Sequence, residues 1–261
     1  PILRGELEKQ GLLSLAETIE MPLVRVLAEM EWAGFKISVE NLRNYAVLLR
    51  EELGKAESAI FELAGEPFNI NSPRQLGDVL FNRLKISDGA QKTKTNQFST
   101  SEEVLVKLAD KHPIVNQVLD FRAMQKLLST YVEALPGLID KRTDKIHTSF
   151  EQAWVSTGRL SSKNPNLQNI PVRDARGKEI RKAFIPSDDD HILLSADYSQ
   201  IELRLMAHLS ADPRMIDAFC HEADIHTATA AKVFKVSEAE VTPAMRSRAK
   251  TANFGIIYGI S

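Results

Sequence analysis

Apolar side chains recur at steps of three and four residues along two long stretches of the chain, which predicts two long helices that pair antiparallel. The first stripe consists of Leu42, Tyr45, Leu49, Leu53, Ala56, Ile60 and Leu63. The second consists of Ile114, Val118, Phe121, Leu128, Tyr131 and Leu135. Ser38 is suited to cap the first helix, while Pro113 and Pro136 mark the start and the end of the second.

Two shorter helices are predicted between the long ones. The first opens at Ser72 and Pro73 and runs to about Leu84, and the second opens at the Thr-Ser-Glu-Glu box of residues 100–103. The linker 85–100 is rich in Lys, Ser and Thr, which indicates an exposed tip, with a plain solvated loop as the alternative. The first half of the chain is therefore predicted to be an all-helical arm.

The pattern changes after Gly137. Segments 145–156, 179–186 and 191–199 are rich in β-branched and aromatic residues with turns between them, which predicts strands. Helix signals return from Ser199, and Thr242 with Pro243 suits the cap and first turn of a last helix. The second half is therefore mixed, and the predicted fold class is α+β.

Composition and charge add one asymmetry to this picture. The 261 residues are 43% hydrophobic and 26% charged, as in an ordinary globular protein. The net charge of −2 gives no indication of nucleic-acid binding. Residues 141–182, however, hold ten Lys and Arg against four Asp and Glu, whereas residues 183–224 hold two against nine. Adjacent basic and acidic segments suit a site that holds a polyanion beside cation-binding carboxylates; a solvated surface is the alternative.

The cysteine content and the two ends bear on compartment and completeness. Cys220 is the only cysteine, so an internal disulfide is excluded. The first twenty residues resemble neither a signal peptide nor a membrane span, so we expect a cytoplasmic protein without a membrane partner. We also expect a monomer. The chain lacks an initiator Met and stops within a motif, so we expect a fragment of a longer protein.

Asp197 is the first candidate for chemistry. It follows the apolar run Ile192–Leu194 and precedes a helix pattern, so we expect its carboxylate at a strand end facing a cleft. Such an oxygen is a suitable ligand for Mg²⁺, and phosphoryl transfer commonly uses two ions. A lone Asp at a strand end is more often a cap, so the position needs support from its surroundings.

The last predicted helix supplies that support. Arg246, Lys250, Phe254 and Tyr258 are spaced by four and so share one face about 18 Å long, close to the reach of a nucleoside triphosphate. Two cations would face phosphates, and two aromatic rings would face sugar and base. An ordinary amphipathic helix is the alternative, but it does not place cations and aromatic rings on the same face.

Further polar residues lie on either side of Asp197. Glu202 could present a carboxylate to the sugar, and His226 could donate to a phosphate, although a single His is more often a satisfied surface or core residue. Upstream, a polar loop contains donors that suit the acceptors of a DNA minor groove: Arg159, Asn166, Gln168 and Asn169. An Asn/Pro turn network that caps itself is the alternative for this loop.

Four strings closely resemble, in order and spacing, the polymerase part of the bacterial DNA polymerase I family: TGRLSSKNPNLQNIP, DYSQIELRLMAHLSAD, DIHTATAAKVF and RSRAKTANFGIIYGIS. The resemblance implies an α+β right-hand polymerase fold. It divides the chain into the tail of a preceding exonuclease-like domain at 1–14, a helical thumb at 15–140, a partial palm at 141–202 and partial, truncated helical fingers at 203–261. It also implies primer-template DNA and dNTPs as partners, in DNA replication and repair.

The resemblance further implies a role for each matching residue. Asp197 and the carbonyl of Tyr198 would bind magnesium, with two Mg²⁺ ions expected in the intact enzyme, and Lys250 would also assist pyrophosphate departure. Glu202 would exclude a ribose 2′-OH. Position 254 holds Phe instead of Tyr, and in this the chain resembles those family members that discriminate against dideoxynucleotides. The nucleotide-binding set is Gln200, Glu202, His226, Arg246, Lys250, Phe254 and Tyr258. The DNA-binding set is Arg159, Asn166, Gln168, Asn169, Lys92 and Lys94.

One departure from the family is that its later HDE motif, which supplies a second metal-binding Asp, is absent from these residues. A lone Asp197 cannot hold two ions, so we expect that this fragment by itself does not extend a primer. Two rival functions remain open. A single-subunit RNA polymerase shares the strand-end Asp and the aromatic helix, although Glu202 argues against it, and a non-catalytic DNA-binding module would use the arm and basic loops alone.

Overall fold

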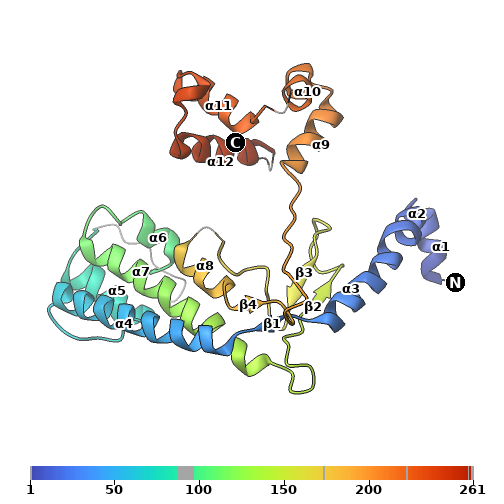
Figure 1. Cartoon of the computed structure of the whole chain (residues 1–261). Helices are drawn as coiled ribbons and strands as arrows, with labels where there is room; N and C mark the ends of the chain where they lie inside the picture. Colours follow the sequence, from blue (N-terminus) through green and yellow to red (C-terminus); the bar gives the residue numbers. More distant parts are fainter. Residues whose placement is uncertain (1, 88–96, 173, 222, 258, 260–261) are drawn as a thin grey trace. The chain divides into compact units, whose positions relative to one another are not determined.

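The computed structural model describes residues 2–87, 97–172, 174–221, 223–257 and 259. The chain forms two compact units, residues 1–193 and 194–261 (Figure 1). Both are dominated by helices, and the strands of the described residues form two small sheets, so the predicted α+β class is confirmed. No helix in the described ranges is long and apolar enough to cross a membrane.

The first unit begins with helices and a short strand: α1 (Ile2–Lys9), α2 (Leu13–Leu15), the π-helix η1 (Ala16–Glu20), α3 (Met21–Ala33), β1 (Lys36–Ile37), α4 (Val39–Ala64), α5 (Pro73–Gly77) and the π-helix η2 (Asp78–Arg83). It continues with α6 (Glu102–Val106), α7 (Pro113–Leu127), the π-helix η3 (Leu128–Val132), the 3₁₀ helix η4 (Leu135–Leu138), β2 (Ser149–Glu151), β3 (Ser161–Lys163), α8 (Ala175–Arg181) and β4 (Phe184–Ile185). The second unit contains α9 (Ile201–Ser210), α10 (Pro213–Cys220), α11 (Ile225–Phe234), the 3₁₀ helix η5 (Glu238–Glu240) and α12 (Pro243–Ile257).

Helices α4 and α7 form the arm that the apolar stripes predicted. They pack side by side and run in opposite directions (Figure 1). The Ser38 hydroxyl accepts a hydrogen bond from the Asn41 N–H, which confirms Ser38 as the N-cap of α4. The buried side chains of the two stripes lie in one hydrophobic core. The predicted extent of the second helix was wrong, because the helix changes to π geometry at Leu128 instead of continuing as an α-helix to Leu135.

The two short helices begin where they were predicted, but only one has the predicted cap. Ser72 accepts a hydrogen bond from the Gln75 N–H at the start of α5. At α6 the capping box does not form, because the Ser101 side chain makes no cap hydrogen bond. The neighbouring Thr100 is engaged by Arg122, whose guanidinium donates to its carbonyl and its hydroxyl.

The strand predictions were partly wrong. In segment 145–156 only Ser149–Glu151 is a strand, and it pairs antiparallel with β3, which lies in the loop predicted to be irregular. In segment 179–186 only Phe184–Ile185 is a strand, paired with β1, a short strand inside the region predicted to be all-helical. Residues up to Arg181 belong to α8 instead, because Asp174 caps this helix by accepting from the Arg176 N–H.

Residues 191–199 were predicted to be a strand, and the structure assigns no strand to them. The apolar side chains of this run lie in solvent, with Ile192 85% and Leu194 87% exposed. A strand requires a neighbour to satisfy its backbone N–H and C=O groups, and the described residues pair no strand with this segment. Asp197 therefore does not stand at a strand end here.

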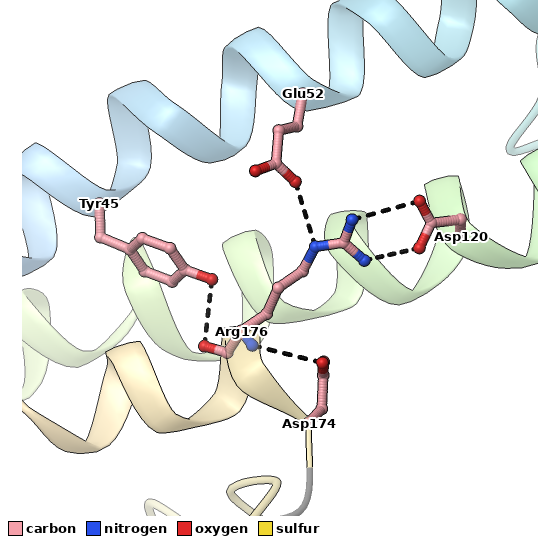
Figure 2. A network of polar contacts seen from close by, with 5 residues as sticks. All are labelled: Tyr45, Glu52, Asp120, Asp174 and Arg176. Atoms are coloured by element: carbon pink, nitrogen blue, oxygen red, sulfur yellow. Dashed lines mark hydrogen bonds and ion pairs between the residues drawn. The ribbon is translucent and has the colours of Figure 1, made fainter.

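A polar network fastens α8 to the arm (Figure 2). Arg176 donates to both carboxylate oxygens of Asp120 on α7 and to Glu52 on α4. The Tyr45 hydroxyl donates to the Arg176 carbonyl, and burial, followed by the charge of Glu52, raises the pKa of Tyr45 to about 12. Gly177 packs against Pro171, where a Cβ atom would clash with the Pro171 carbonyl oxygen. This close contact requires glycine.

The second unit is a set of short helices in which α11 packs against α12. Thr242 caps α12 as predicted, because its hydroxyl accepts from the Met245 N–H at 3.3 Å. Among the described residues of the second unit, the buried ones are few and mostly small: Leu203, Ala207, His226, Ala230 and Ala249. The predicted borders between tail, thumb, palm and fingers stay predictions.

Candidate functional site

Asp224 lies at the centre of a polar cluster between α11 and α12. It caps α11, with one carboxylate oxygen accepting from the His226 N–H at 3.0 Å. The other oxygen accepts from the Thr227 hydroxyl at 2.9 Å and from Nε of Arg246 at 2.5 Å. Burial alone would raise the pKa of Asp224, but the hydrogen bonds from Arg246 and Thr227 outweigh it and lower the pKa to about 2. The carboxylate is therefore ionised at neutral pH.

His226 lies beside this carboxylate and is only 1% exposed. Its ring centroid is 5.7 Å from that of Phe254, and its Nδ1 is 3.1 Å from the side-chain nitrogen of Asn253. Burial lowers the pKa of His226, the charges of Arg246 and Lys250 lower it further, and Asp224 opposes them. An Asn N–H that donates to Nδ1 requires an unprotonated Nδ1, which leaves Nε2 as the N–H donor of the neutral ring.

The predicted face of α12 is present over the residues that the structure describes. Lys250 Nζ lies 5.8 Å from the ring centroid of Phe254, within cation–π distance. Arg246 is two turns before Phe254 on the same helix and reaches Asp224. The structure thus brings together His226, Arg246, Lys250 and Phe254. Tyr258, the fourth residue of the predicted face, lies outside the described residues.

The residues predicted around Asp197 are not brought into a metal site. Asp197 and Tyr198 lie in the irregular segment before α9, where Tyr198 is 80% exposed. Gln200 precedes α9 in a left-handed conformation, φ 52° and ψ 36°, and Glu202 lies in the first turn of that helix. Among the described residues, no group of three or more His, Cys, Asp or Glu side chains could hold a metal ion. These residues therefore do not fit a two-ion site by themselves.

The polar loop 159–169 in the first unit is held by its own hydrogen bonds. The Asn166 side-chain oxygen accepts from the N–H groups of Gln168 and Asn169, and the Gln168 side-chain oxygen accepts from the Ser162 N–H. The self-capping turn network is therefore present. It uses the two amide oxygens, and within the described chain neither side-chain amide nitrogen has a protein acceptor. The loop thus directs both amide oxygens to its own backbone.

A groove of about 1000 Å³ adjoins this loop in the same unit. Its lining includes Lys126, Trp154, Lys163, Asn166 and Asn169. The Tyr131 hydroxyl donates to the Asn169 carbonyl at 2.8 Å, which ties the loop to the arm. Arg159 is exposed nearby in sequence. Lys92 and Lys94, the other predicted DNA contacts, lie outside the described residues.

Sequence reasoning missed several residues that shape these sites. Asp224 was not among the predicted site residues, although an Asp two residues before a His at a helix start is a recognisable cap signal. Asn253 had no signal of its own, because its contacts to His226 and Thr229 join two helices. Trp154 and Tyr131 likewise became candidates only through the groove and the contact with Asn169.

Comparison with known proteins places the chain among polymerases. The model of DNA polymerase family A matches residues 39–261. The chain is 52% identical over 256 residues to DNA polymerase I of Bacillus subtilis (strain 168), covering 98% of this chain and 29% of that protein. It is 48% identical over 258 residues to the thermostable DNA polymerase I of Thermus aquaticus, covering 98% of this chain and 31% of that protein.

A solved structure shares the fold at moderate identity. It is the POL domain of Pol1 from M. smegmatis in complex with DNA primer-template and dNTP, with a TM-score of 0.90 and 39% sequence identity. The match covers 99% of this chain and 45% of that chain. The chain thus spans less than a third of the two curated relatives and under half of this domain.

Proposed function

Because the chain belongs to DNA polymerase family A, we propose that it forms part of a template-directed DNA polymerase that adds deoxynucleotides to a primer 3′ end. Primer-template DNA and dNTPs are the proposed partners. The observation that carries this proposal is the arrangement of His226, Arg246, Lys250 and Phe254 between α11 and α12. Two cations and a buried neutral His beside an aromatic ring suit a triphosphate attached to a sugar.

In the proposed site the residues of α12 bind the nucleotide along the helix. Arg246 and Lys250 contact the phosphates, and Lys250 also assists the departing pyrophosphate. Phe254 packs on the sugar, while Tyr258 packs on the nascent base pair. His226 donates to a phosphate from Nε2, which its contact with Asn253 supports.

Residues before and within the start of α9 complete the proposed nucleotide site. Glu202 blocks a ribose 2′-OH and so selects deoxynucleotides. Gln200 has a buried side-chain oxygen without a hydrogen-bond partner in the described part of the chain, which supports a role in accepting a hydrogen bond from the nucleotide.

The proposed DNA contacts belong to the loop 159–169 of the first unit and to Lys92 and Lys94. Asn166 and Gln168 offer amide donors whose orientation is set by the hydrogen bonds of their own oxygens. The minor groove offers acceptors at similar places on every base pair, so such donors would test pair geometry without reading the sequence. Arg159 and Asn169 extend this donor surface.

Magnesium is the proposed metal, and Asp197 with the Tyr198 carbonyl are the ligands proposed from this chain. Bound Mg²⁺ would polarise the phosphoryl group and stabilise the attacking and leaving oxygens. The described residues hold no group of three or more side chains that could bind the ion by themselves. We expect that a polypeptide limited to these residues binds DNA weakly and does not extend a primer.

Primer extension by the intact protein tests the proposal. Asp197→Ala should abolish Mg²⁺-dependent extension of a primer by dNTPs, while duplex affinity changes little, since removal of a metal ligand affects chemistry more than DNA binding. Asp217→Ala is the matched control, because the Asp217 side chain is 75% exposed on α10.

Three results would contradict the proposal. Extension that survives Asp197→Ala would remove the metal role of Asp197. Preferential use of rNTPs would favour an RNA polymerase. An intact protein that binds duplex DNA without any extension would be a binding module.

A further inference from the structure

Asp224 accepts a hydrogen bond from the guanidinium of Arg246 through Nε. We propose that Asp224 is a positioning residue, which orients Arg246 so that its two terminal nitrogens face a phosphate group. This inference rests on the proposed nucleotide site of α12 and adds to it a residue that acts through Arg246. The ligand class is a triphosphate or another linear polyphosphate.

The hydrogen bonds around Asp224 define this orientation. The carboxylate is fixed from the α11 side by the His226 N–H and the Thr227 hydroxyl. From α12 it receives Nε of Arg246, at 2.5 Å. Neither terminal nitrogen of Arg246 donates to any acceptor among the described residues. The guanidinium therefore keeps its terminal N–H donors for a ligand while its Nε edge is anchored.

The anchored side chain points along a face that already carries a second cation. Lys250 follows Arg246 by four residues, about 6 Å along the helix axis. This spacing is wider than that of neighbouring phosphates and is closer to the span between the first and the last phosphate of a triphosphate. An Arg side chain loses rotamer freedom when it binds a ligand, and anchoring it in advance lowers that cost. The Arg246 side chain remains 43% exposed, so a ligand can reach it.

Two effects of Asp224 oppose each other. Its negative charge repels a phosphate, whereas its hydrogen bond to Nε orients the guanidinium. The site is partly exposed, with Asp224 and Arg246 side chains 33% and 43% accessible, so solvent and salt weaken the repulsion. The oriented hydrogen bonds of a guanidinium with phosphate depend on geometry. We therefore expect orientation to outweigh repulsion.

Two substitutions separate the effects. Asp224→Asn removes the charge but keeps one acceptor oxygen, which can accept from Nε of Arg246 while the cap hydrogen bond from the His226 N–H is lost. Asp224→Ala removes both oxygens. With inorganic tripolyphosphate as the probe, calorimetry should show roughly 10-fold weaker binding for Asp224→Ala and binding within about twofold of the wild type for Asp224→Asn. In the intact protein, Asp224→Ala should raise the KM for dNTP about 10-fold and lower kcat less.

Asp212→Ala is the matched control. Asp212 caps α10 through two hydrogen bonds of 2.9 Å, to the N–H groups of Arg214 and Met215, and no Arg side chain is anchored to it among the described residues. Its substitution should remove a cap without changing the affinity for tripolyphosphate. A loss of affinity that appears for both caps would show a general effect on folding and overturn the inference.

Other outcomes also overturn it. Tighter binding by both Asp224 variants would show that the carboxylate competes with the ligand, and unchanged binding by Asp224→Ala would leave it a helix cap only. The proposed polymerase function fails separately. If the wild-type intact protein does not extend primers but the Ala and Asn variants still differ in tripolyphosphate binding, the positioning role stands. If extension occurs and this difference is absent, only the positioning role falls.

Discussion

The arm in the first unit and the helices of the second unit are stabilised in different ways. The arm encloses a continuous core of large apolar side chains from α4, α7 and the short helices between them. The described part of the second unit buries only Leu203, three alanines and the polar His226. In the arm, therefore, apolar burial dominates stability, whereas in the second unit polar side chains proposed to bind the ligand also join the helices.

The polar networks of the two units occupy different places. Arg176 on α8 binds Asp120 and Glu52 of the arm, and these three side chains lie at the edge of the arm's apolar core (Figure 2). In the second unit, Asp224 and Arg246 join α11 to α12 beside the buried His226. Because of this difference, we expect the arm to tolerate the loss of its polar contacts better than the loss of its apolar core.

Leu49→Ala should have the largest effect on stability. Leu49 is 1% exposed in the core of α4, and such a truncation leaves a cavity that costs about 2–5 kcal/mol in the free energy of unfolding. Urea denaturation measures this loss. Leu48→Ala is the matched control, because its neighbouring side chain is 56% exposed; it should change stability by ~0.5 kcal/mol or less. Equal effects at the two positions would contradict the core assignment.

Arg176→Met should have an intermediate effect. The Arg176 side chain is 29% exposed and joins α8 to two arm helices, so its loss should cost about 1 kcal/mol. The same denaturation measurement applies. Arg25→Met is the control, because Arg25 is 87% exposed in a single ion pair with Glu29 and should contribute ~0.5 kcal/mol or less. A cost for Arg176→Met as large as that of Leu49→Ala would reverse the proposed order.

The two units should also differ in how their stability depends on pH, because they should respond at opposite ends of the scale. Burial holds the folded pKa of His226 below 6.5, so the unfolded chain takes up the proton first as the pH falls. The stability of the second unit should therefore be full above pH 6.5 and decline as the pH falls from there toward the folded pKa. Thermal unfolding followed by NMR signals of α11 and α12 measures this, and His226→Asn should flatten the dependence.

Tyr45 supplies the opposite response in the arm. Its folded pKa of about 12 exceeds the usual 10.0, so the unfolded chain loses the proton first as the pH rises. Stability of the arm should be full below pH 10 and decline between pH 10 and 12. Tyr45→Phe should reduce this alkaline loss in NMR signals of α4. An arm that loses stability at acidic pH through His226 would contradict the separation of the two units.

Predictions from the sequence succeeded where the determining interactions are local. The apolar stripes of α4 and α7 and the caps at Ser38, Ser72 and Thr242 involve residues within one or a few turns. The failures were at strands. Segment 191–199 has the composition of a strand, but a strand forms only with a partner, and in the described residues none pairs with it.

The candidate site residues show the same difference between local patterns, which the sequence reveals, and contacts that depend on the folded chain. Spacing by four was sufficient to place Arg246, Lys250 and Phe254 on one face of α12, because helix geometry repeats over that distance. The metal role of Asp197 and the DNA contacts of the loop stay predictions. The direction of the Asn166 and Gln168 amides came from hydrogen bonds within the folded loop, which composition does not reveal.

The sequence by itself determined the helical arm, the α+β class and the residue types available for a nucleotide site, because periodicity and capping act over short distances along the chain. Only the tertiary structure decided that Asp224 anchors Arg246, that Asn253 meets His226 and that Arg176 joins three helices. Those contacts join residues more than twenty positions apart, and their formation depends on how helices pack rather than on any local pattern.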